Sequence, residues 1–284
     1  MRTIEPGIEH AVERQRTTSS LGVPRELEIA LNAPIGPHRV ADDTVVIDED
    51  GWYRTLTASS TWPGANEVLF SNLDADNPHS HLREIVSEYH GRGLPVSWCV
   101  YPWTRPADLG ARLVKLGASR TPIRVFLINT AHPLEEVEEV EVRRVDAGDD
   151  EQFGAYMEIT RAEHGLPAAE EAFRRRRYRE LSLGPRPLMQ LYLAYCKGVP
   201  AGCHATVVKE DSGHFTGGCA IPRFRAYGVL QSMLAVSLKA LRDMGIRMAT
   251  GHSNQNSAFW ADRFGFQSVY SYDLYELFPP VRRG

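Results

Sequence analysis

The chain has 284 residues, 43% of them hydrophobic and 24% charged, which is typical of a soluble globular protein with one large domain or two ordinary ones. Its formal net charge of −4 argues against a general nucleic-acid binder. No apolar run approaches the roughly 18 residues that a membrane-spanning helix needs, and residues 1–16 lack the apolar core of a signal peptide. We therefore expect a cytoplasmic protein without membrane segments.

Two helices and two strands are predicted in the first half, after an arm or helix over residues 1–30. The apolar faces of the helices are made by Leu82, Ile85, Val86 and Tyr89 and by Leu109, Leu113 and Leu116. Apolar strands lie at residues 94–100 and 123–128. The acidic, Pro-containing stretch 131–142 then separates apolar runs. We place a domain boundary there, which gives one domain at 31–135 and another at 136–284.

The second half begins with a strand at 142–145 and a helix at 150–164. A second helix carries the arginine run 174–177, which we interpret as a solvated face balanced by Glu170, Glu171 and Glu180. A hairpin follows, with Lys197-Gly198 as its turn, and then a strand at 214–221. The remaining order is an arginine turn, a helix, a strand, an Asn-rich turn and a helix that is closed by Gly265-Phe266.

The same order of helix, glycine turn, strand, turn and helix occurs in both halves, which favours an internal repeat and a mixed sheet. The segment before the first repeated helix reads NLDADNPHSH and is acidic, whereas the second half has its arginine turn at that place. An acidic segment repels a negatively charged ligand such as a pyrophosphate, which a positive turn could hold. We therefore expect the first copy to be degenerate and to shape the cleft for the other substrate, the acceptor.

The turn at residues 225–230, RAYGVL, places Arg225 and Gly228 before a helix. The free N–H groups and the dipole of a helix N-terminus suit a phosphate. With AIP before this turn and N-x-x-S followed by G-F after it, the chain resembles the GNAT N-acyltransferase superfamily. The resemblance implies an α/β fold with a mixed sheet in two tandem GNAT-like domains, and an acyl-CoA donor such as acetyl-CoA. It also implies donor contacts from Ile221, Arg225, Tyr227, Gly228, Val229, Leu230, Asn254 and Ser257.

The chain departs from the family pattern at two positions. Leu230 stands where a small residue is usual, and Ala261 stands where the family's tyrosine acid would fall. Alanine cannot donate a proton, so the departing thiolate needs another donor or leaves unassisted. For the base that accepts the amine proton, Glu163 is the first candidate, followed by His164 and His204.

The four cysteines, Cys99, Cys196, Cys203 and Cys219, form no C-x-x-C pair, so we expect buried, reduced thiols. His79 and His81 have no cysteine partners nearby in the sequence, and no metal site is expected. Cys203 and Cys219 lie near the arginine turn, so a nucleophilic role for either is an alternative.

Three functions stay open at this level. The first is transfer of an acyl group from acyl-CoA to the amine of a small molecule. The second keeps the fold but takes an acyl or aminoacyl group from tRNA or a carrier protein for amide formation in natural-product biosynthesis, with the arginine run as a phosphate contact. The third is a non-catalytic CoA-binding sensor or scaffold. The sequence specifies neither the acceptor nor the oligomeric state.

Overall fold

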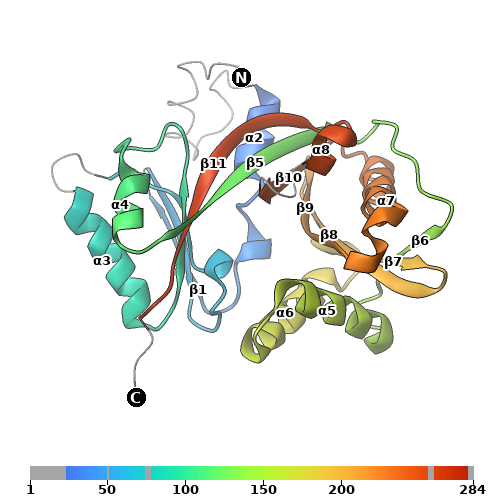
Figure 1. Cartoon of the computed structure of the whole chain (residues 1–284), viewed down its shortest axis with the longest axis horizontal. Coiled ribbons are helices and arrows are strands. Elements are labelled where there is room, and N and C mark those ends of the chain that lie inside the picture. Colours follow the sequence, from blue (N-terminus) through green and yellow to red (C-terminus); the bar gives the residue numbers. More distant parts are fainter. Residues whose placement is uncertain (1–23, 50, 74–77, 255–258, 281–284) are drawn as a thin grey trace. The chain divides into compact units, whose positions relative to one another are not determined.

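A computed structural model describes residues 24–49, 51–73, 78–254 and 259–280 of the chain. The chain forms two compact units (Figure 1). The first takes in residues up to Leu31, Arg39–Arg124 and residues from Tyr270 onwards, and the second takes in Asn32–His38 and Val125–Val269. The chain therefore crosses from one unit to the other more than once.

The first unit is built on a sheet with the strand order β1-β2-β3-β4-β11-β5. β1, β2 and β3 form an antiparallel meander, β3 and β4 are parallel, and β4 pairs with β11 in antiparallel fashion. The elements of this unit are α2 (Arg25–Asn32), β1 (Thr44–Glu49), β2 (Trp52–Thr57), β3 (Glu67–Phe70), α3 (Pro78–Gly91), β4 (Val96–Val100), α4 (Leu109–Lys115), β5 (Ser119–Asn129) and β11 (Gln267–Leu277). Of these, β5 and β11 also contribute residues to the second unit. Short 3₁₀ turns lie at Pro37–Arg39 and Pro63–Ala65.

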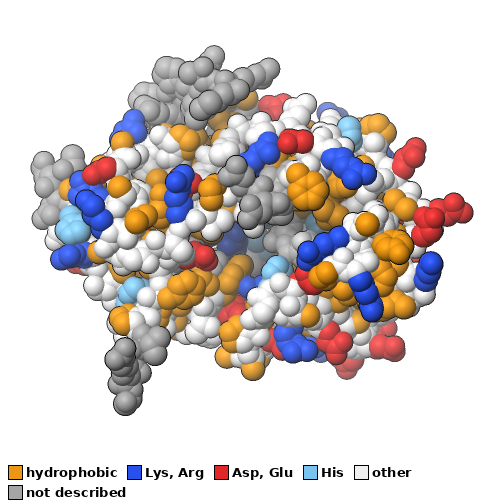
Figure 2. Space-filling view, in the orientation of Figure 1, with side chains coloured by type: hydrophobic (Ala, Val, Ile, Leu, Met, Phe, Trp, Pro, Cys, Tyr) orange, Lys and Arg blue, Asp and Glu red, His pale blue; other side chains and the backbone are white. Residues whose placement is uncertain are grey.

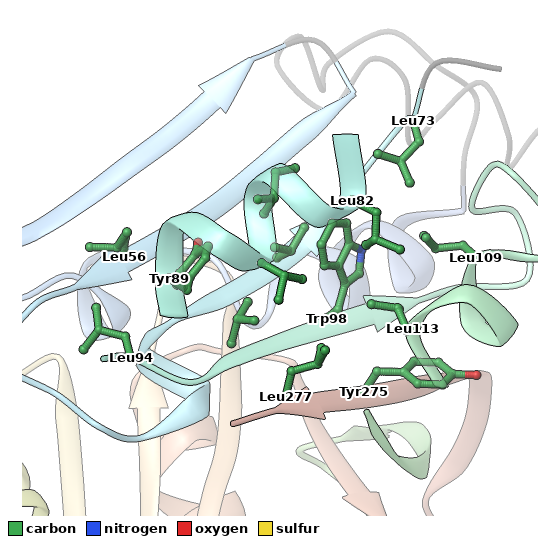
Figure 3. Close-up of a cluster of buried hydrophobic side chains, with 14 residues drawn as sticks. Leu56, Leu73, Leu82, Tyr89, Leu94, Trp98, Leu109, Leu113, Tyr275 and Leu277 are labelled. Atoms are coloured by element: carbon green, nitrogen blue, oxygen red, sulfur yellow. The ribbon is translucent and has the colours of Figure 1, made fainter. Parts of the chain in front are cut away.

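The core of the first unit lies where α3 and α4 pack on one face of this sheet (Figure 3). Trp98 is fully buried at its centre, and its indole Nε1 donates a hydrogen bond to Ser71 Oγ at 2.9 Å. The buried face of α3 consists of the four residues that helical spacing predicted, namely Leu82, Ile85, Val86 and Tyr89. In α4, Leu109 and Leu113 are fully buried and Leu116 packs against the same cluster. The predicted apolar faces are thus confirmed.

The second unit has the strand order β5-β10-β9-β8-β7-β6. β6 to β9 are antiparallel, and β9 and β10 are parallel. Its elements are β6 (Val140–Arg144), α5 (Asp150–His164), α6 (Ala168–Ser182), β7 (Met189–Cys196), β8 (Val199–Val208), β9 (Ser212–Ala220), a 3₁₀ turn η3 (Pro222–Tyr227), α7 (Val229–Asp243), β10 (Met248–Asn254) and α8 (Phe259–Arg263). Lys197 and Gly198 both have positive φ in the predicted hairpin turn between β7 and β8.

Helices cover both faces of the second sheet (Figure 1). Leu191 and Leu193 of β7 pack in the cluster that contains α5, while Ala194 and Cys196 pack in the cluster that contains α7. Successive side chains of a strand point to opposite faces, so β7 alternates between the two layers without any polar face. On the face shown in Figure 2, Lys and Arg side chains are interspersed with Asp and Glu, in keeping with a small net charge.

The two halves of the chain repeat seven elements in the same order. β1-β2-β3-α3-β4-α4-β5 corresponds to β7-β8-β9-α7-β10-α8-β11, with two antiparallel pairings and one parallel pairing at the same places. The last strand of each copy is long, and β11 completes the sheet of the first unit. The expected mixed α/β class with tandem copies is confirmed. The boundary near residue 135 lies between β5 and β6, and we keep it as the proposed border of the two copies.

The ends of α5 are fixed by local chemistry, which positions two candidate residues. Asp149 caps the N-terminus, with its carboxylate accepting from the N–H groups of Glu151 and Gln152 at 2.9 and 3.1 Å. Gly165 ends the helix in the left-handed region with φ of 59°. Glu163 and His164 therefore occupy the last turn of α5, as predicted.

Neither a membrane-spanning helix nor a metal site is found among the described residues. Within the ranges that the structure describes, no helix is long and apolar enough to cross a bilayer. In the same ranges, no group of three or more His, Cys, Asp or Glu side chains is arranged to hold a metal ion.

The core of the first unit leads to a stability prediction with a control in the same helix. Leu113 is fully buried, whereas its neighbour Val114 is 51% exposed. Leu113→Ala should lower the free energy of unfolding by about 2–5 kcal/mol because it leaves a cavity. Val114→Ala should change it by no more than about 0.5 kcal/mol. Urea unfolding followed by tryptophan fluorescence reports on this cluster, since Trp98 lies in it. Equal losses for the two variants would contradict the described packing of α4.

Candidate functional site

The second unit contains a gap between two parallel strands. β9 and β10 pair over four residue pairs, from Ser212 opposite Met248 to Phe215 opposite Gly251. β9 then continues to Ala220 beside β8, while β10 continues to Asn254. The second half of β9 is therefore paired on its β8 side and has no described ladder with β10. Main-chain groups along that edge are available to a ligand.

A β-bulge bends β9 where the two strands separate. Cys203 pairs with Cys219 and Ala205 with Thr216, so the single residue His204 faces both Gly217 and Gly218. Gly217 has φ of 61°, a conformation that glycine adopts without strain. Bulges bend a strand and re-aim the groups that follow. Two consecutive glycines inside a strand are the sequence signal that could have located this bulge.

After the bulge, the main-chain N–H and C=O groups of Ala220 are directed to the free edge of β9, whereas those of Ile221 are not. The N–H of Ile221 donates to Ala201 O at 2.9 Å, and its carbonyl accepts from Phe224 N at 2.8 Å. Both groups of Ile221, which we expected to hold the donor arm, are thus already engaged. Since alternate residues of a strand direct their N–H and C=O to opposite edges, those of Ala220 point away from β8. In agreement, Arg225 Nε donates to Ala220 O at 3.1 Å.

The predicted arginine turn leads into α7 through Gly228. This glycine is the N-cap residue of α7, with φ of 76°, and no side chain caps the helix. The first N–H groups of α7 therefore lack a side-chain acceptor within the described residues. Val229 is fully buried, and Leu230 packs against two hydrophobic clusters. Tyr227 is 49% exposed.

The acidic stretch between the two copies lies along the first turns of α7. Val137 N donates to Ser232 Oγ at 2.9 Å, and Gln231 Nε2 donates to Glu135 O at 2.9 Å. A Cβ on Gly228 would come within 2.5 Å of Val137 Cγ2. Any side chain at Gly228 would therefore clash in addition to being strained.

Arg225 and Glu163, which we assigned separately to donor and acceptor, form an ion pair. Arg225 Nη2 lies 3.1 Å from Glu163 Oε2, with the arginine side chain 62% exposed and the glutamate 17% exposed. An ion pair this exposed contributes about 0–1 kcal/mol, so a phosphate can compete for the guanidinium. The pair joins the last turn of α5 to the turn before α7.

The two histidine candidates differ in their surroundings. His164 is exposed, but partial desolvation of its ring, and then the charge of Arg174, lower its pKa, while Glu163 acts in the opposite direction. His204 is only 2% exposed, and burial lowers its pKa to about 3. Its Nε2 lies 3.2 Å from Thr206 Oγ1, and its ring stacks on Tyr192. His204 is thus a neutral core residue, and we do not carry it into the proposed chemistry.

The remaining predicted positions lie after the gap. Asn254 ends β10 and is exposed. Ser257 lies outside the described residues. Ala261 is fully buried in a cluster with Phe266, and Trp260 packs against that cluster. The position where the family tyrosine would fall therefore carries no acid.

Two further contacts lie close to this gap. His214 of β9 and His252 of β10 make an edge-to-face contact with ring centroids 5.2 Å apart. Tyr178 Oη of α6 lies 4.0 Å from the position that a Cβ would take on Gly217. Neither contact has a local sequence signal, because each joins elements distant in the chain.

Together these features fit a phosphate-bearing thioester. The helix N-terminus and Arg225 suit a pyrophosphate, and the free edge of β9 suits an extended amide-containing arm. All described residues of this arrangement belong to the second unit.

Comparisons with known proteins agree with this geometry. Residues 128–250 match the family model described as an acetyltransferase (GNAT) domain. No curated protein matches the sequence. This segment of the chain is therefore similar to GNAT acetyltransferase domains, whose fold supports acyl transfer in general.

Solved structures show the same fold over most of the chain. A conserved protein of unknown function from Staphylococcus epidermidis is 12% identical, with a TM-score of 0.70, and the match covers 86% of this chain and 98% of that one. A GCN5-related N-acetyltransferase from Kribbella flavida is 15% identical, with a TM-score of 0.63 and coverage of 91% and 97%. A tandem GNAT protein from the clavulanic acid biosynthesis pathway is 11% identical, with a TM-score of 0.56 and coverage of 96% and 94%. The tandem arrangement thus has a counterpart of similar length.

The burial of His204 predicts a pH dependence of stability. In the unfolded chain a histidine titrates near ~6.5, whereas the pKa of His204 in the folded protein is about 3. Between these values the unfolded state binds one proton more, so stability falls as the pH is lowered, by at most about 1.4 kcal/mol per pH unit. His204→Gln should remove this contribution.

Urea unfolding of both proteins between pH 7 and pH 4.5 measures the effect. As the pH falls, the unfolding free energy of the unchanged protein should decrease more than that of the His204→Gln variant. A difference that stays constant over this range would contradict the buried, neutral state of His204.

Proposed function

We propose that the second unit transfers an acyl group, acetyl in the simplest case, from acyl-CoA to the amine of a small molecule. The observation that carries this proposal is the uncapped N-terminus of α7 beside the free edge of β9, in a segment that matches the GNAT domain. Bound acyl-CoA would supply a thioester whose carbonyl carbon is the electrophile.

Binding of the donor would use main-chain groups more than side chains. The N–H groups of Gly228, Val229 and Leu230 would hold the pyrophosphate, with Arg225 adding a positive charge. Tyr227, Asn254 and Ser257 keep their proposed donor contacts. The N–H of Ala220 would face the arm in place of Ile221, because only Ala220 directs its main chain away from β8.

Glu163 is the proposed base for the incoming amine. Its carboxylate is mostly shielded and lies beside the donor turn through Arg225. It would accept the proton that the amine loses as its lone pair attacks, and His164 in the same turn is the second candidate. Orientation of the amine against the thioester would supply most of the rate, without a covalent enzyme intermediate.

The arginine run does not favour tRNA or a carrier protein as donor. Guanidinium nitrogens of three arginines lie close to carboxylate oxygens of the same helix. The distances are 3.0 Å for Arg174 and Glu170, 3.4 Å for Arg175 and Glu171, and 3.1 Å for Arg177 and Glu180. These guanidinium groups are paired along their own helix, as predicted, but the predicted solvated face is wrong for Arg174 and Glu170, which are buried. A CoA donor therefore has the stronger support.

A charge placed at the start of α7 tests the donor site, although Gln231→Glu also gives up the hydrogen bond from Gln231 Nε2 to Glu135 O. Gln231→Glu keeps the side-chain length, and an acidic residue in the first turn favours a helix. The same charge should oppose a pyrophosphate, weakening binding of CoA and acetyl-CoA by about 1–2 kcal/mol, or roughly five- to thirtyfold. Titration calorimetry measures the affinity of each protein for CoA and acetyl-CoA.

Gln267→Glu makes the same change on β11, at an exposed position, and is the matched control. It should leave CoA affinity unchanged. Equal affinity of Gln231→Glu and the unchanged protein for CoA would remove the start of α7 from the donor site. Absence of CoA binding by the unchanged protein would refute the proposed donor itself.

Replacement of the proposed base separates chemistry from binding. Glu163→Gln should lower kcat by roughly 10²–10⁴ because it removes general-base assistance. Donor affinity should change far less, since the ion pair with Arg225 is exposed. Release of CoA thiol with a panel of primary amines, at saturating acetyl-CoA, measures kcat.

Glu158→Gln on the exposed face of α5 is the control and should keep full activity. A loss of less than about threefold for Glu163→Gln, well below the usual range, would exclude Glu163 as the base. Binding of acetyl-CoA without turnover on any amine would favour a non-catalytic CoA-binding protein.

A further inference from the structure

Two cysteines face each other beside the bulge of β9. Cys203 of β8 and Cys219 of β9 are directly opposite in register, and their Sγ atoms are 3.3 Å apart. A disulfide needs a separation of ~2.05 Å, so the sulfurs have to approach by only about 1.2 Å. The Cα atoms of opposed antiparallel residues are ~4.5–5.5 Å apart, which lies inside the range that disulfides span.

The surroundings give the two thiols different roles. Cys203 is fully buried and also lies 3.5 Å from Thr160 Oγ1, whereas Cys219 is partly exposed. The hydrogen bond from the Cys203 thiol lowers the pKa of Cys219, and the same contact, together with burial, raises the pKa of Cys203. An attacking thiol must be reachable and able to ionise, while a resolving thiol must only lie within reach of its partner.

We infer that Cys203 and Cys219 are a dithiol modification site that takes a low-molecular-weight disulfide and closes into a cross-strand disulfide. The Cys219 thiolate attacks one sulfur of the small disulfide, a mixed disulfide forms, and one small thiol leaves. The Cys203 thiol then loses its proton and attacks Cys219 Sγ, which releases the second small thiol. One small disulfide is reduced to two thiols as the protein dithiol is oxidised.

The other two cysteines provide an internal comparison. Cys99 and Cys196 are 1% and 3% exposed. Burial, followed by the charge of Glu67, raises the pKa of Cys99 well above its ordinary value. Buried thiols of this kind are inert. The proposed reaction is therefore confined to Cys203 and Cys219, and it does not depend on the protein being an acyltransferase.

The test uses the fully reduced, full-length protein and oxidised glutathione as the probe. After incubation under native conditions and acid quenching, intact mass should fall by two hydrogens, and peptide mapping without reductant should find the 203–219 link. Dithiothreitol should restore the original mass. A protein that keeps four thiols, or a link that involves Cys99 or Cys196, would overturn the inference.

Single variants test the order of attack. Cys203→Ser should accumulate one glutathione on Cys219, because the resolving thiol is gone. Cys219→Ser should leave Cys203 unmodified over the same time, and Cys196→Ser should behave like the unchanged protein. Glutathione on Cys203 at a rate equal to that on Cys219 would contradict the assigned roles. Should a variant fail to fold, the peptide map of the unchanged protein still decides whether the link forms.

Discussion

The pairing of β9 with β10 over four residue pairs is the constraint on which the candidate site depends. In a continuous parallel ladder, the main chain of both strands would be satisfied by the neighbouring strand. Here β9 keeps β8 as its partner along its whole length, and the bulge at Gly217 and Gly218 bends it as the strands separate. The edge so released ends at Ala220, whose carbonyl accepts a hydrogen bond from Arg225 Nε and whose N–H is directed away from β8. The turn into α7 follows within a few residues, so in the proposed site one continuous piece of chain would contact both the donor's arm and its phosphates.

Charges around this edge are arranged in local pairs. Arg225 bridges Ala220 O and Glu163, while the arginines of α6 pair with glutamates one turn away. The Arg174–Glu170 pair is buried, whereas the guanidinium of Arg225 is exposed, and ion pairs that are open to water are weak and rearrange readily. The Arg225–Glu163 pair therefore joins the proposed donor and acceptor sides without locking either. A phosphate that engages the arginine would release the carboxylate for its proposed role as base.

Duplication explains why the chain crosses between its two units. Each copy ends in a long strand, and the strand of the second copy, β11, pairs with β4 of the first. The copies share their order of elements and the parallel pairing after the meander. They differ before the repeated helix, where the second copy alone has the arginine turn. The two copies thus have one architecture and different local chemistry.

The sequence by itself determined the features that depend on neighbours along the chain. The apolar faces of α3 and α4 follow from helical spacing, the ends of α5 from Asp149 and Gly165, and the β7–β8 turn from Lys197-Gly198. The order of elements was also sufficient to indicate the GNAT fold and its tandem copies. Each of these depends on contacts only a few residues apart, so periodicity, capping and turn chemistry report them directly.

Only the tertiary structure decided which residues meet across elements. It paired Arg225 with Glu163, 62 positions away, and it placed Cys219 against Cys203. It also buried His204 in the core, although the sequence offers it as one of three candidate bases. These outcomes depend on strand register and on which face of a strand meets a helix. A shift of one residue in the register reverses every side chain of a strand, so residue type and spacing alone leave such contacts undetermined.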